Sequence, residues 1–361
     1  MNKIVTINIV NWDGIKHLPY CLESIYKQDY EGKIEIIVVD NFSQDGSLEY
    51  LEQKHNGIKI LKNTTNKGFS YAHNQAIRAS LGEYILPLNF DVFLKPNFIS
   101  EMVRVMESDS RIGIISGKLY KQINGNKSKI IDSTGIIMEH CFMRPRGELE
   151  KDTGQYDNPE NYKVFGACGA APFYRRAMLE DIKCLNEFFD EDFVNYVEDV
   201  DLSWRAQMRG WSCIYNPNAV AYHERGVTRK NKYTIQQAYI AYGLRNRYYS
   251  MIKNITPQYW GKNKFKIIGR ELIFHLSSIK DISRFSRLKA LYLTFIKLKI
   301  FLAKRRLIQQ RKLTSDDYMD YFLCYNSLSL YKMSAAVLSF EMKNIILILK
   351  NRNKVLLNNG Q

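Results

Sequence analysis

The N-terminal quarter of the chain alternates short β-branched runs with helical segments, and this alternation constrains the fold most. The first two runs are "KIVTINIVNW" and "KIEIIVVDN", and apolar residues at helical spacing lie between them. Further helices are predicted over residues 47–54 and 71–80, and further strands over 58–63 and 83–89. Strands joined through helices are parallel. The sequence therefore predicts an α/β fold with an open, mostly parallel, Rossmann-like sheet covered on both faces.

The pattern is less regular after Gly113. Strands are predicted over residues 113–120, 132–138 and 212–224, and a polar loop over 144–162. Residues 164–182 begin with small side chains and become helical, and "VDLSWRAQM" is a second helix. From about residue 236 the chain is helical by pattern. We expect a less regular second half of the sheet, followed by helices.

The excess of positive over negative charge is confined to the C-terminal third. Residues 1–226 hold 26 Lys and Arg against 31 Asp and Glu, whereas residues 227–361 hold 26 against 6. This asymmetry indicates a polyanionic partner, either membrane or nucleic acid. No apolar run reaches the roughly 18 residues needed to span a bilayer. The six cysteines form no C-x-x-C pair and no signal peptide is recognisable, so we expect reduced thiols in the cytoplasm.

Polar residues end three of the predicted strands. Ligands of parallel sheets bind at the carboxyl ends of the strands, where this chain has Asn11, Asp40 and Asp91. It lacks the Gly-rich turn of a Rossmann dehydrogenase and has no P-loop, so a carboxylate-held divalent cation is the expected means of neutralising a nucleotide's phosphates. Asn89 and Asp91 face the same side by strand alternation. The alternative, that Asx residues simply favour turns at strand ends, stays open for Asp40 and Asp91.

Three acids, Glu198, Asp199 and Asp201, lie within four residues at the start of a predicted helix. Acids in a first helical turn interact favourably with the helix dipole, each by about 0.3–1 kcal/mol, and we assign this role to Asp201. Glu198 and Asp199 follow Tyr196 in a segment rich in phenylalanine. Such surroundings raise the pKa of a carboxyl group, which suits a general base near neutrality.

Several motifs together resemble the family 2 glycosyltransferases, and specifically their rhamnosyltransferase-like branch. They occur in family order from residue 4 to about residue 250: "IVNWDG", "IIVVDNFSQDGS", "NKGFSYAHNQAI", "LPLNFDVFL", "FGACGAAPFYRRAML", "FDEDFVNYVEDVDLSWRAQMRGW" and "AVAYHERG". The resemblance implies a GT-A catalytic domain over residues 1–250, a nucleotide-sugar donor, Mn²⁺ or Mg²⁺ as cofactor, and inversion at the anomeric carbon. Residues 251–361 would be a helical, basic C-terminal region.

The resemblance also implies roles for individual residues. Asp199 matches the catalytic base, with Glu198 orienting it or binding the acceptor. Asp91 and His223 match metal-binding positions, although His223 could also be an ordinary strand-end residue. Asn89 replaces the first acid of the family's Asp-x-Asp motif, and its neutral amide predicts weaker metal binding. The predicted donor-binding residues are Asn11, Asp40, Lys67 and Asn89.

Four residues are candidates for the acceptor site, and three of them have a structural alternative. The two glycines would let the acceptor approach the backbone closely or form a flexible turn. The aromatic candidate would serve as a sugar platform, although a helix-face core position is the favoured interpretation. These candidates are Gly166, Gly169, Trp204 and Arg205.

The predicted reaction is transfer of a sugar to a hydroxyl group of a glycan or lipid-linked oligosaccharide in cell-surface polysaccharide synthesis. Asp199 would take the proton of the hydroxyl group while a metal on Asp91 stabilises the leaving diphosphate. UDP- and dTDP-linked donors both stay open, with rhamnose as one candidate sugar. The Gln-x-x-Arg-Trp motif of processive members is absent, so we expect single additions.

The basic helical segment leaves alternatives for the partner. "LKALYLTFIKLKIFLAKRRL" mixes apolar and basic residues, as helices at an anionic membrane surface do. This predicts a peripheral protein at the inner face of the plasma membrane; a helical subdomain or a homodimer contact is the alternative. Two rival classes are a catalytically dead glycosyltransferase scaffold, favoured by Asn89, and a basic nucleic-acid-binding protein. The acids of the N-terminal region would repel phosphate, so we predict no nucleic-acid partner.

Overall fold

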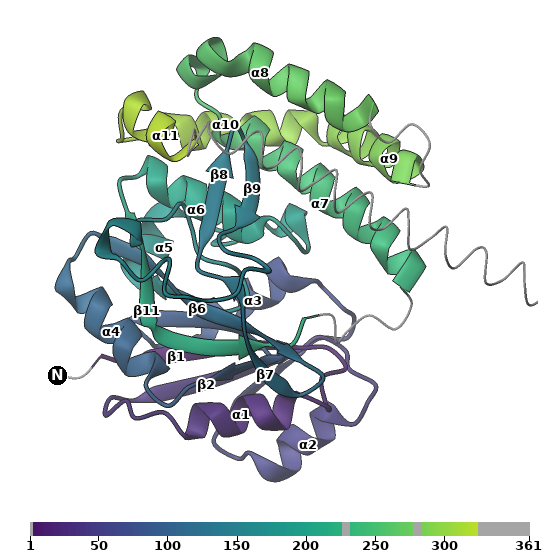
Figure 1. Ribbon diagram of the computed structural model, residues 1–361. Coiled ribbons are helices and arrows are strands. Elements are labelled where there is room, and N and C mark those ends of the chain that lie inside the picture. Colours follow the sequence, from purple (N-terminus) through teal and green to yellow (C-terminus); the bar gives the residue numbers. More distant parts are fainter. Residues whose placement is uncertain (1–2, 226–231, 277–282, 324–361) are drawn as a thin grey trace, which may run out of the picture. The chain divides into compact units, whose positions relative to one another are not determined.

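The computed structural model describes residues 3–225, 232–276 and 283–323 (Figure 1). These residues belong to one compact unit that ends at Leu323. The predicted boundary at residue 250 falls within helix α7 (Lys232–Asn254) of this unit. The division into a catalytic region and a basic C-terminal region stays a prediction.

Over the described residues, nine strands form one sheet in the order β3-β2-β1-β4-β10-β6-β11-β5, with β7 paired to β6. The first four strands in chain order are parallel: β1 (Val5–Asn11), β2 (Ile34–Asp40), β3 (Lys59–Lys62) and β4 (Tyr84–Asn89). The others are β5 (Val92–Leu94), β6 (Ile112–Ile123), β7 (Asn126–Ser133), β10 (Pro172–Arg175) and β11 (Ser212–His223). Their pairings are antiparallel except that between β6 and β11, so the sheet is mixed beyond β4.

Helices cover both faces of the sheet because its strands are apolar on both sides. Val5, Ile7 and Ile9 of β1 pack with α1 (Leu18–Tyr26), α2 (Ser47–Lys54) and α4 (Phe98–Ser108). On the opposite face Ile37 and Ile85 pack beneath α3 (Phe69–Ala79), α5 (Arg176–Ile182) and α6 (Glu198–Met208). Burial on both faces is typical of parallel sheets. The predicted α/β fold is confirmed.

Two segments differ from the prediction. Residues 132–138 are not one strand: the chain turns at Gly135, whose φ is +120°, and continues as β8 (Ile136–Glu139). β8 pairs with β9 (Phe142–Pro145), whose last two residues overlap the loop predicted over residues 144–162. The small-residue segment 164–182 contains β10, which lies between β4 and β6. A strand of four residues carries too little periodic pattern to be recognised in the sequence.

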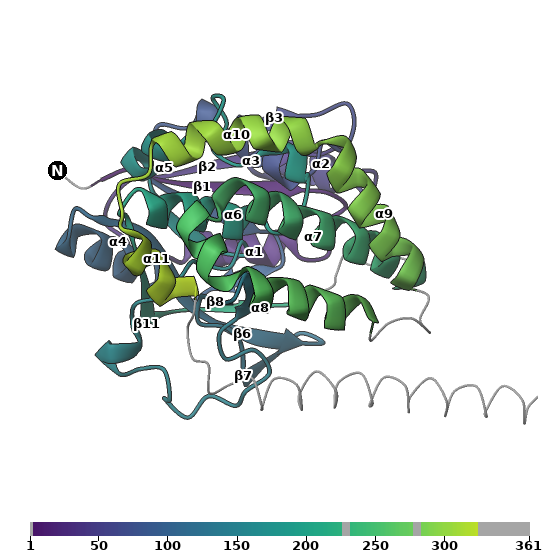
Figure 2. The same ribbon diagram turned by 90° about the horizontal axis from the view of Figure 1, so that it is seen from above.

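The C-terminal helices lie on the side of α6 that faces away from β1 and β2 (Figures 1 and 2). They are α7, α8 (Pro257–Leu276), α9 (Ser283–Ile296), α10 (Leu298–Gln310) and α11 (Asp316–Leu323). α7 packs against α6, α9 and α10, and α11 packs against β8. The predicted C-terminal helical region is therefore confirmed as far as Leu323. In the ranges that the structure describes, no helix combines the length and apolarity needed to cross a bilayer.

Candidate functional site

Asn11 and Asp40 lie side by side where β1 and β2 end. They are direct partners in the parallel register of these strands. The Nδ2 group of Asn11 donates to Asp40 Oδ1 at 2.9 Å, and also to the hydroxyl groups of Ser43 and Ser47 at 2.9 and 2.8 Å. The backbone N–H of Ser43 donates to Asp40 Oδ2 at 3.1 Å. The two predicted donor residues therefore fix the loop that follows β2.

Two exposed rings lie within two residues of these buried polar residues in the sequence. Trp12 is 43% exposed and Phe42 is 48% exposed. Phe42 has a φ of +70°, so the chain turns sharply at the point where its ring reaches solvent. Aromatic faces of this kind can stack on a nucleobase. Neither ring was identified from the sequence. An aromatic residue next to an asparagine at the end of a predicted strand, as in Asn11-Trp12 and Asn41-Phe42, could have indicated them.

Lys67 is exposed in the loop before α3. Its backbone N–H donates to Asn41 Oδ1 at 3.0 Å, and Asn63 Nδ2 donates to the same oxygen at 3.1 Å. Asn41 directly follows β2 and is buried. It therefore attaches the Lys67 loop to the sheet edge that carries Asn11 and Asp40, and it is a positioning residue that the sequence did not reveal.

The two predicted metal ligands lie together at the same edge. Asp91 connects β4 to β5, and His223 ends β11, where it pairs with Val92 of β5. His223 Nε2 lies 3.5 Å from Asp91 Oδ1, and its Nδ1 lies 2.9 Å from Asp132 Oδ2. Burial lowers the pKa of His223, but the two carboxylates outweigh burial and raise it to about 9. Asp132, on β7, was missed by sequence reasoning because its strand pairing was unknown.

The donor set at this position fits a metal that is shared with a ligand. A histidine whose second nitrogen contacts a carboxylate is the usual supported form of a metal-binding histidine. Within the described residues, however, no group of three or more His, Cys, Asp and Glu side chains converges on one point. Mg²⁺ commonly takes only one or two protein carboxylates and completes its shell with phosphate oxygens and water. Asp91 and His223 therefore fit as a partial site for a divalent cation.

The candidate base, Asp199, lies in the first turn of α6. Its Oδ2 accepts from the backbone N–H of Gly169 at 2.7 Å, and its Oδ1 from that of Val200 at 2.8 Å. Burial raises the pKa of Asp199 above its ordinary value, although these backbone donors act against the rise. Burial, followed by the charge of Asp199, raises the pKa of Glu198 well above its usual range. The pair can therefore accept a proton near neutral pH.

Residues 168–170 connect the base to the metal-binding side. The carbonyl of Ala170 accepts from the backbone N–H of Asn89 at 2.9 Å, one residue from the N–H that holds Asp199. Arg225 Nε lies 2.6 Å from Asp132 Oδ1, and its Nη2 lies 4.0 Å from the sulfur of Cys168. Asn89, two residues before Asp91, and Asp199 therefore both bond to this short segment.

Of the four acceptor candidates, Gly169 contacts the base. A Cβ atom on Gly169 would lie 3.2 Å from Asp199 Oδ2, whereas one on Gly166 would lie 2.3 Å from Ser203 Oγ. Gly166 is thus required by close packing against α6. Trp204 and Arg205 are 1% and 2% exposed. Their burial favours structural roles, and the acceptor role of these four residues stays a prediction.

The acid-bearing segment is held by the C-terminal helices. Asp201 does lie in the first turn of α6, but it is also fully buried against charged partners: Lys253 Nζ at 2.9 Å and Arg205 Nε at 3.0 Å. Lys253 also donates to Asp190 at 2.5 Å, and Lys304 of α10 donates to Asp190 at 2.6 Å. The helix dipole is therefore only part of the reason for an acid at position 201.

Asn246 of α7 holds the same segment through its backbone. Its Nδ2 group lies 2.8 Å from each of three carbonyl oxygens, those of Phe193, Asn195 and Tyr196. Tyr196 and Val197 have positive φ values of 73° and 71°. Non-glycine residues adopt this conformation at a cost, so the contacts from α7 stabilise the turn that leads into Glu198.

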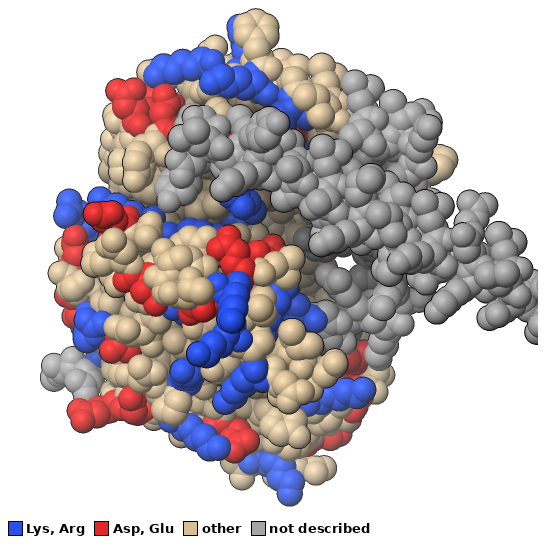
Figure 3. Space-filling model, viewed as in Figure 1, with Lys and Arg blue, Asp and Glu red and all other residues tan. Residues whose placement is uncertain are grey.

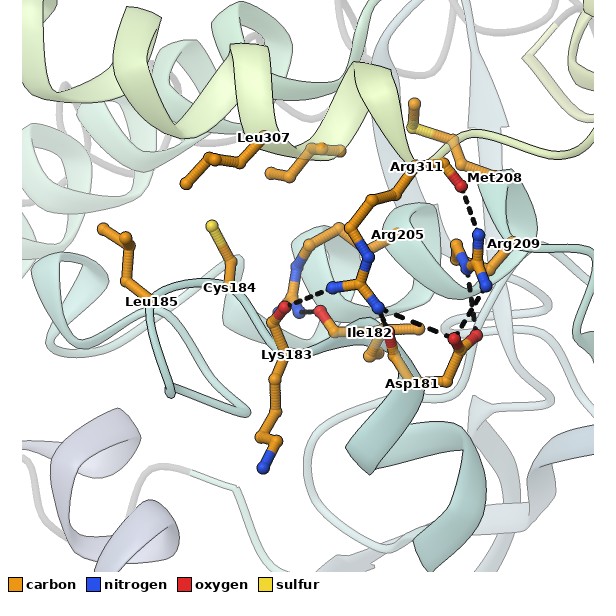
Figure 4. Close-up of a pocket in the computed structure, with 11 residues that line it drawn as sticks. Asp181, Ile182, Lys183, Cys184, Leu185, Arg205, Met208, Arg209, Leu307 and Arg311 are labelled. Carbon is orange, nitrogen blue, oxygen red and sulfur yellow. Dashed lines mark hydrogen bonds and ion pairs between the residues drawn. The ribbon is translucent and has the colours of Figure 1, made fainter.

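A separate cavity lies at the opposite end of α6 (Figure 4). Its volume is about 210 Å³, and its lining comes from α5, α6, α10 and the turn after α5. Arg205 is the predicted site residue that contributes to it. The other two arginines of the cavity lining already have hydrogen-bond partners within the protein. Arg209 binds the carboxylate of Asp181, and Arg311 donates to the backbone carbonyls of Asp181 and Lys183. Nothing in this lining relates it to the acid pair.

Comparison with known proteins supplies a family match for the N-terminal part of the chain. Residues 6–183 match the family model described as "Glycosyl transferase family 2". These residues form a glycosyl transferase family 2 domain. The matched range contains Asn11, Asp40, Asp91 and Gly169, while Asp199 and His223 lie beyond it. The rhamnosyltransferase-like branch stays a prediction.

Two curated relatives match part of the chain. Glycosyltransferase GlyG of Streptococcus pneumoniae is 31% identical over 130 residues, which are 35% of this chain and 43% of the relative. The poly-beta-1,6-N-acetyl-D-glucosamine synthase of Staphylococcus aureus is 23% identical over 234 residues, or 62% of this chain and 52% of the synthase. The chain thus spans about half the length of these relatives.

Solved structures share the fold. GalNAc-T7, crystallised with UDP, GalNAc and Mn²⁺, has a TM-score of 0.62 at 17% identity, with 90% of this chain and 57% of that chain covered. The mannosyltransferase PcManGT of Pyrobaculum calidifontis, in complex with GDP-Man and Mn²⁺, has a TM-score of 0.50 at 17% identity, with 92% and 86% covered. The predicted GT-A-type fold is confirmed.

Proposed function

We propose that this protein is an inverting, non-processive glycosyltransferase that moves a sugar from a nucleotide-sugar donor to a hydroxyl group. The observation that carries the proposal is Asp199, a carboxylate of raised pKa held by Gly169 next to the end of β4. A base at this place is what inverting transfer requires, because the attacking hydroxyl group must lose its proton as the new bond forms.

The donor nucleotide binds at the ends of β1 and β2. Trp12 and Phe42 offer ring faces to the base, and Asn11 with Asp40 holds the loop that carries Phe42. The exposed Lys67 contacts the diphosphate. UDP- and dTDP-linked sugars, with rhamnose among the candidate sugars, are the proposed donors; the structural neighbours bind UDP or GDP-Man.

Asp91 and His223 would hold Mn²⁺ or Mg²⁺, with Asn89 nearby as a neutral polar group. The bound cation would neutralise charge on the departing diphosphate. Asp132 contacts Nδ1 of His223, which keeps the ring oriented, and it also forms an ion pair with Arg225. The crystal structures of both neighbours contain Mn²⁺, which supports a divalent cation here.

Asp199 and Glu198 carry out the proton chemistry. The acceptor oxygen bonds to the anomeric carbon as the bond from that carbon to the diphosphate breaks, and the hydroxyl proton passes to Asp199. Glu198, 6% exposed and with a strongly raised pKa, orients the acceptor or Asp199. The negative charge of one carboxylate raises the pKa of its neighbour, so the pair can accept a proton near neutral pH.

The proposed acceptor is a glycan or lipid-linked oligosaccharide at the inner face of the plasma membrane, in the synthesis of a cell-surface polysaccharide. The Staphylococcus aureus relative is named as a polysaccharide synthase, which supports this setting. A homodimer is a second proposed association.

The test is release of nucleoside diphosphate from a panel of UDP-, dTDP- and GDP-sugars, with and without Mn²⁺. A thermal-shift measurement on the same panel identifies which donors bind. Metal-dependent release from a donor that also raises the melting temperature supports the proposal. Binding without release from any donor, with every acceptor tried, would instead support a catalytically dead scaffold.

A further inference from the structure

α8 carries apolar side chains on two opposite faces. Tyr259 and Ile267 lie on one face and are 0% and 2% exposed. Phe265, Ile268 and Leu272 follow one another at intervals of three and four residues, which places them on the other face. Phe265 is 79% exposed and Leu272 is 57% exposed. An amphipathic surface helix normally presents polar side chains to solvent, so this face of α8 lacks an apolar partner among the residues that the structure describes.

α9 repeats the same arrangement. Ala290, fully buried, marks the face toward α7. Phe285, Leu288, Tyr292 and Phe295 lie at intervals of three, four and three residues on the opposite face. Phe285 and Phe295 are 82% and 76% exposed.

The two stripes belong to adjoining helices. Arg287 of α9 donates to the carbonyl of Phe274 in α8, and Figures 1 and 2 both show the end of α8 next to the start of α9. We call the combined set the α8–α9 apolar surface: Phe265, Ile268, Leu272, Ile273, Phe285, Leu288, Tyr292, Phe295 and Ile296, all exposed. Soluble proteins rarely expose so many large apolar side chains together unless another surface covers them.

Positive charge surrounds these side chains. α8 and α9 together contain seven Lys and Arg and one Glu. Lys266 and Lys289 are exposed on the two helices, and Lys299 is exposed at the start of α10. Figure 3 shows Lys and Arg side chains along α8 beside uncharged residues. A partner must therefore be both apolar and anionic.

This double requirement separates the candidate partners. Residues 324–361 carry five Lys and Arg against one Glu, and a second copy of the chain would bring the same basic surface, so both are of like charge. Nucleic acid matches the charge but has no continuous apolar surface to cover the exposed Ile, Leu and Phe side chains. An anionic bilayer interface has both negative headgroups and acyl chains.

We propose that the α8–α9 apolar surface lies in the interface of an anionic membrane. Phe265, Phe285 and Phe295 enter the acyl-chain boundary, and Lys266 and Lys289 meet the headgroups. The inference deepens the proposed function, because a lipid-linked acceptor would be met at the same interface; the physical claim of membrane binding does not depend on catalysis.

The experiment uses the full chain and vesicles of phosphatidylcholine, with or without phosphatidylglycerol. The wild-type protein is expected to sediment with the anionic vesicles and to stay in solution with the neutral ones. The variant with Phe265→Ser and Phe295→Ser is expected to lose at least about tenfold in vesicle affinity, since apolar burial drives interfacial binding. Leu81→Ser, which changes a 70% exposed leucine outside this surface, is the matched control and should bind as the wild type does.

Two results would overturn the proposal: absence of wild-type binding to anionic vesicles, or equal binding by the Phe265→Ser, Phe295→Ser variant. Sedimentation velocity without lipid distinguishes a protein partner, because a wild-type dimer that the variant abolishes would show that a second copy covers this surface. Melting temperatures of the variants check that they are folded. Donor hydrolysis in lipid-free buffer is measured separately, so failure of the proposed enzyme activity is distinguishable from failure of membrane binding.

Discussion

Replacing Lys253 by methionine should destabilise the protein strongly, because Lys253 neutralises two buried acids. Its side chain is 0% exposed, and Nζ donates to Asp190 at 2.5 Å and to Asp201 at 2.9 Å. Removing one partner of a buried ion pair typically costs about 3–5 kcal/mol. Lys304 still contacts Asp190 and Arg205 still contacts Asp201. We therefore expect a loss near the lower end, about 3 kcal/mol.

Denaturant unfolding at neutral pH measures this loss. The matched control is Lys299→Met, an exposed lysine of α10, which should change the free energy of unfolding by less than about 0.5 kcal/mol. Combining Lys253→Met with Asp201→Asn should give a smaller loss than the sum of the single variants, because the second change removes an acid that the first leaves without its lysine.

The same variant should shift the dependence of stability on pH. Burial acts to raise the pKa of Asp190 and Asp201, but Lys253 together with Lys304 at Asp190, and with Arg205 at Asp201, outweighs burial and holds both pKa values below the ordinary value. A depressed pKa in the folded state stabilises the protein above the unfolded pKa of about 4, and this contribution is lost as pH falls through the folded value. Without Lys253 both pKa values rise, so acid destabilisation should begin at higher pH.

An unchanged free energy of unfolding and an unchanged acid transition in Lys253→Met would refute the reasoning. They would mean that α7 does not hold the segment that carries Asp199. A loss of stability equal to that of Lys299→Met would have the same meaning, since the buried and exposed lysines would then be equivalent.

Two further predictions concern the acids of the site. Asp132→Asn should weaken Mn²⁺ affinity by about 10–100-fold, as changes behind a metal-binding histidine do, and calorimetry with UDP and Mn²⁺ would contradict this by showing wild-type affinity. Glu198→Gln should raise the free energy of unfolding at neutral pH by about 1–3 kcal/mol, because it removes a buried carboxyl group whose ionisation is disfavoured by burial and by the charge of Asp199. Because its pKa is raised in the folded state, the wild type gains stability as pH falls from that pKa toward the unfolded value of about 4. A less stable Glu198→Gln variant at neutral pH would contradict the argument.

The strand-end residues were predictable because they depend on local pattern and on parallel register. Asn11 and Asp40 follow strongly β-branched runs, and parallel strands align their carboxyl ends at one edge. The metal pair was predicted through resemblance, and the structure adds the 3.5 Å contact between Asp91 and His223.

Contacts between distant segments were not predictable. Asp132 reaches His223, 91 residues away in sequence, only because β6 pairs with both β7 and β11. Lys253 and Asn246 lie in a region whose composition indicates a basic surface. The sequence alone does not distinguish a buried lysine from an exposed one. Burial of Lys253 depends on acids at positions 190 and 201, which no local periodicity connects to α7.

The most direct test of the proposed mechanism compares donor binding with sugar transfer in Asp199→Asn. Asparagine keeps the size of the side chain and can still accept the backbone hydrogen bond from Gly169, but it cannot take up a proton. The variant should bind the nucleotide-sugar donor with wild-type affinity while its transfer rate falls by about 100–10,000-fold. Transfer at a rate close to that of the wild type would contradict the assignment of Asp199 as the base.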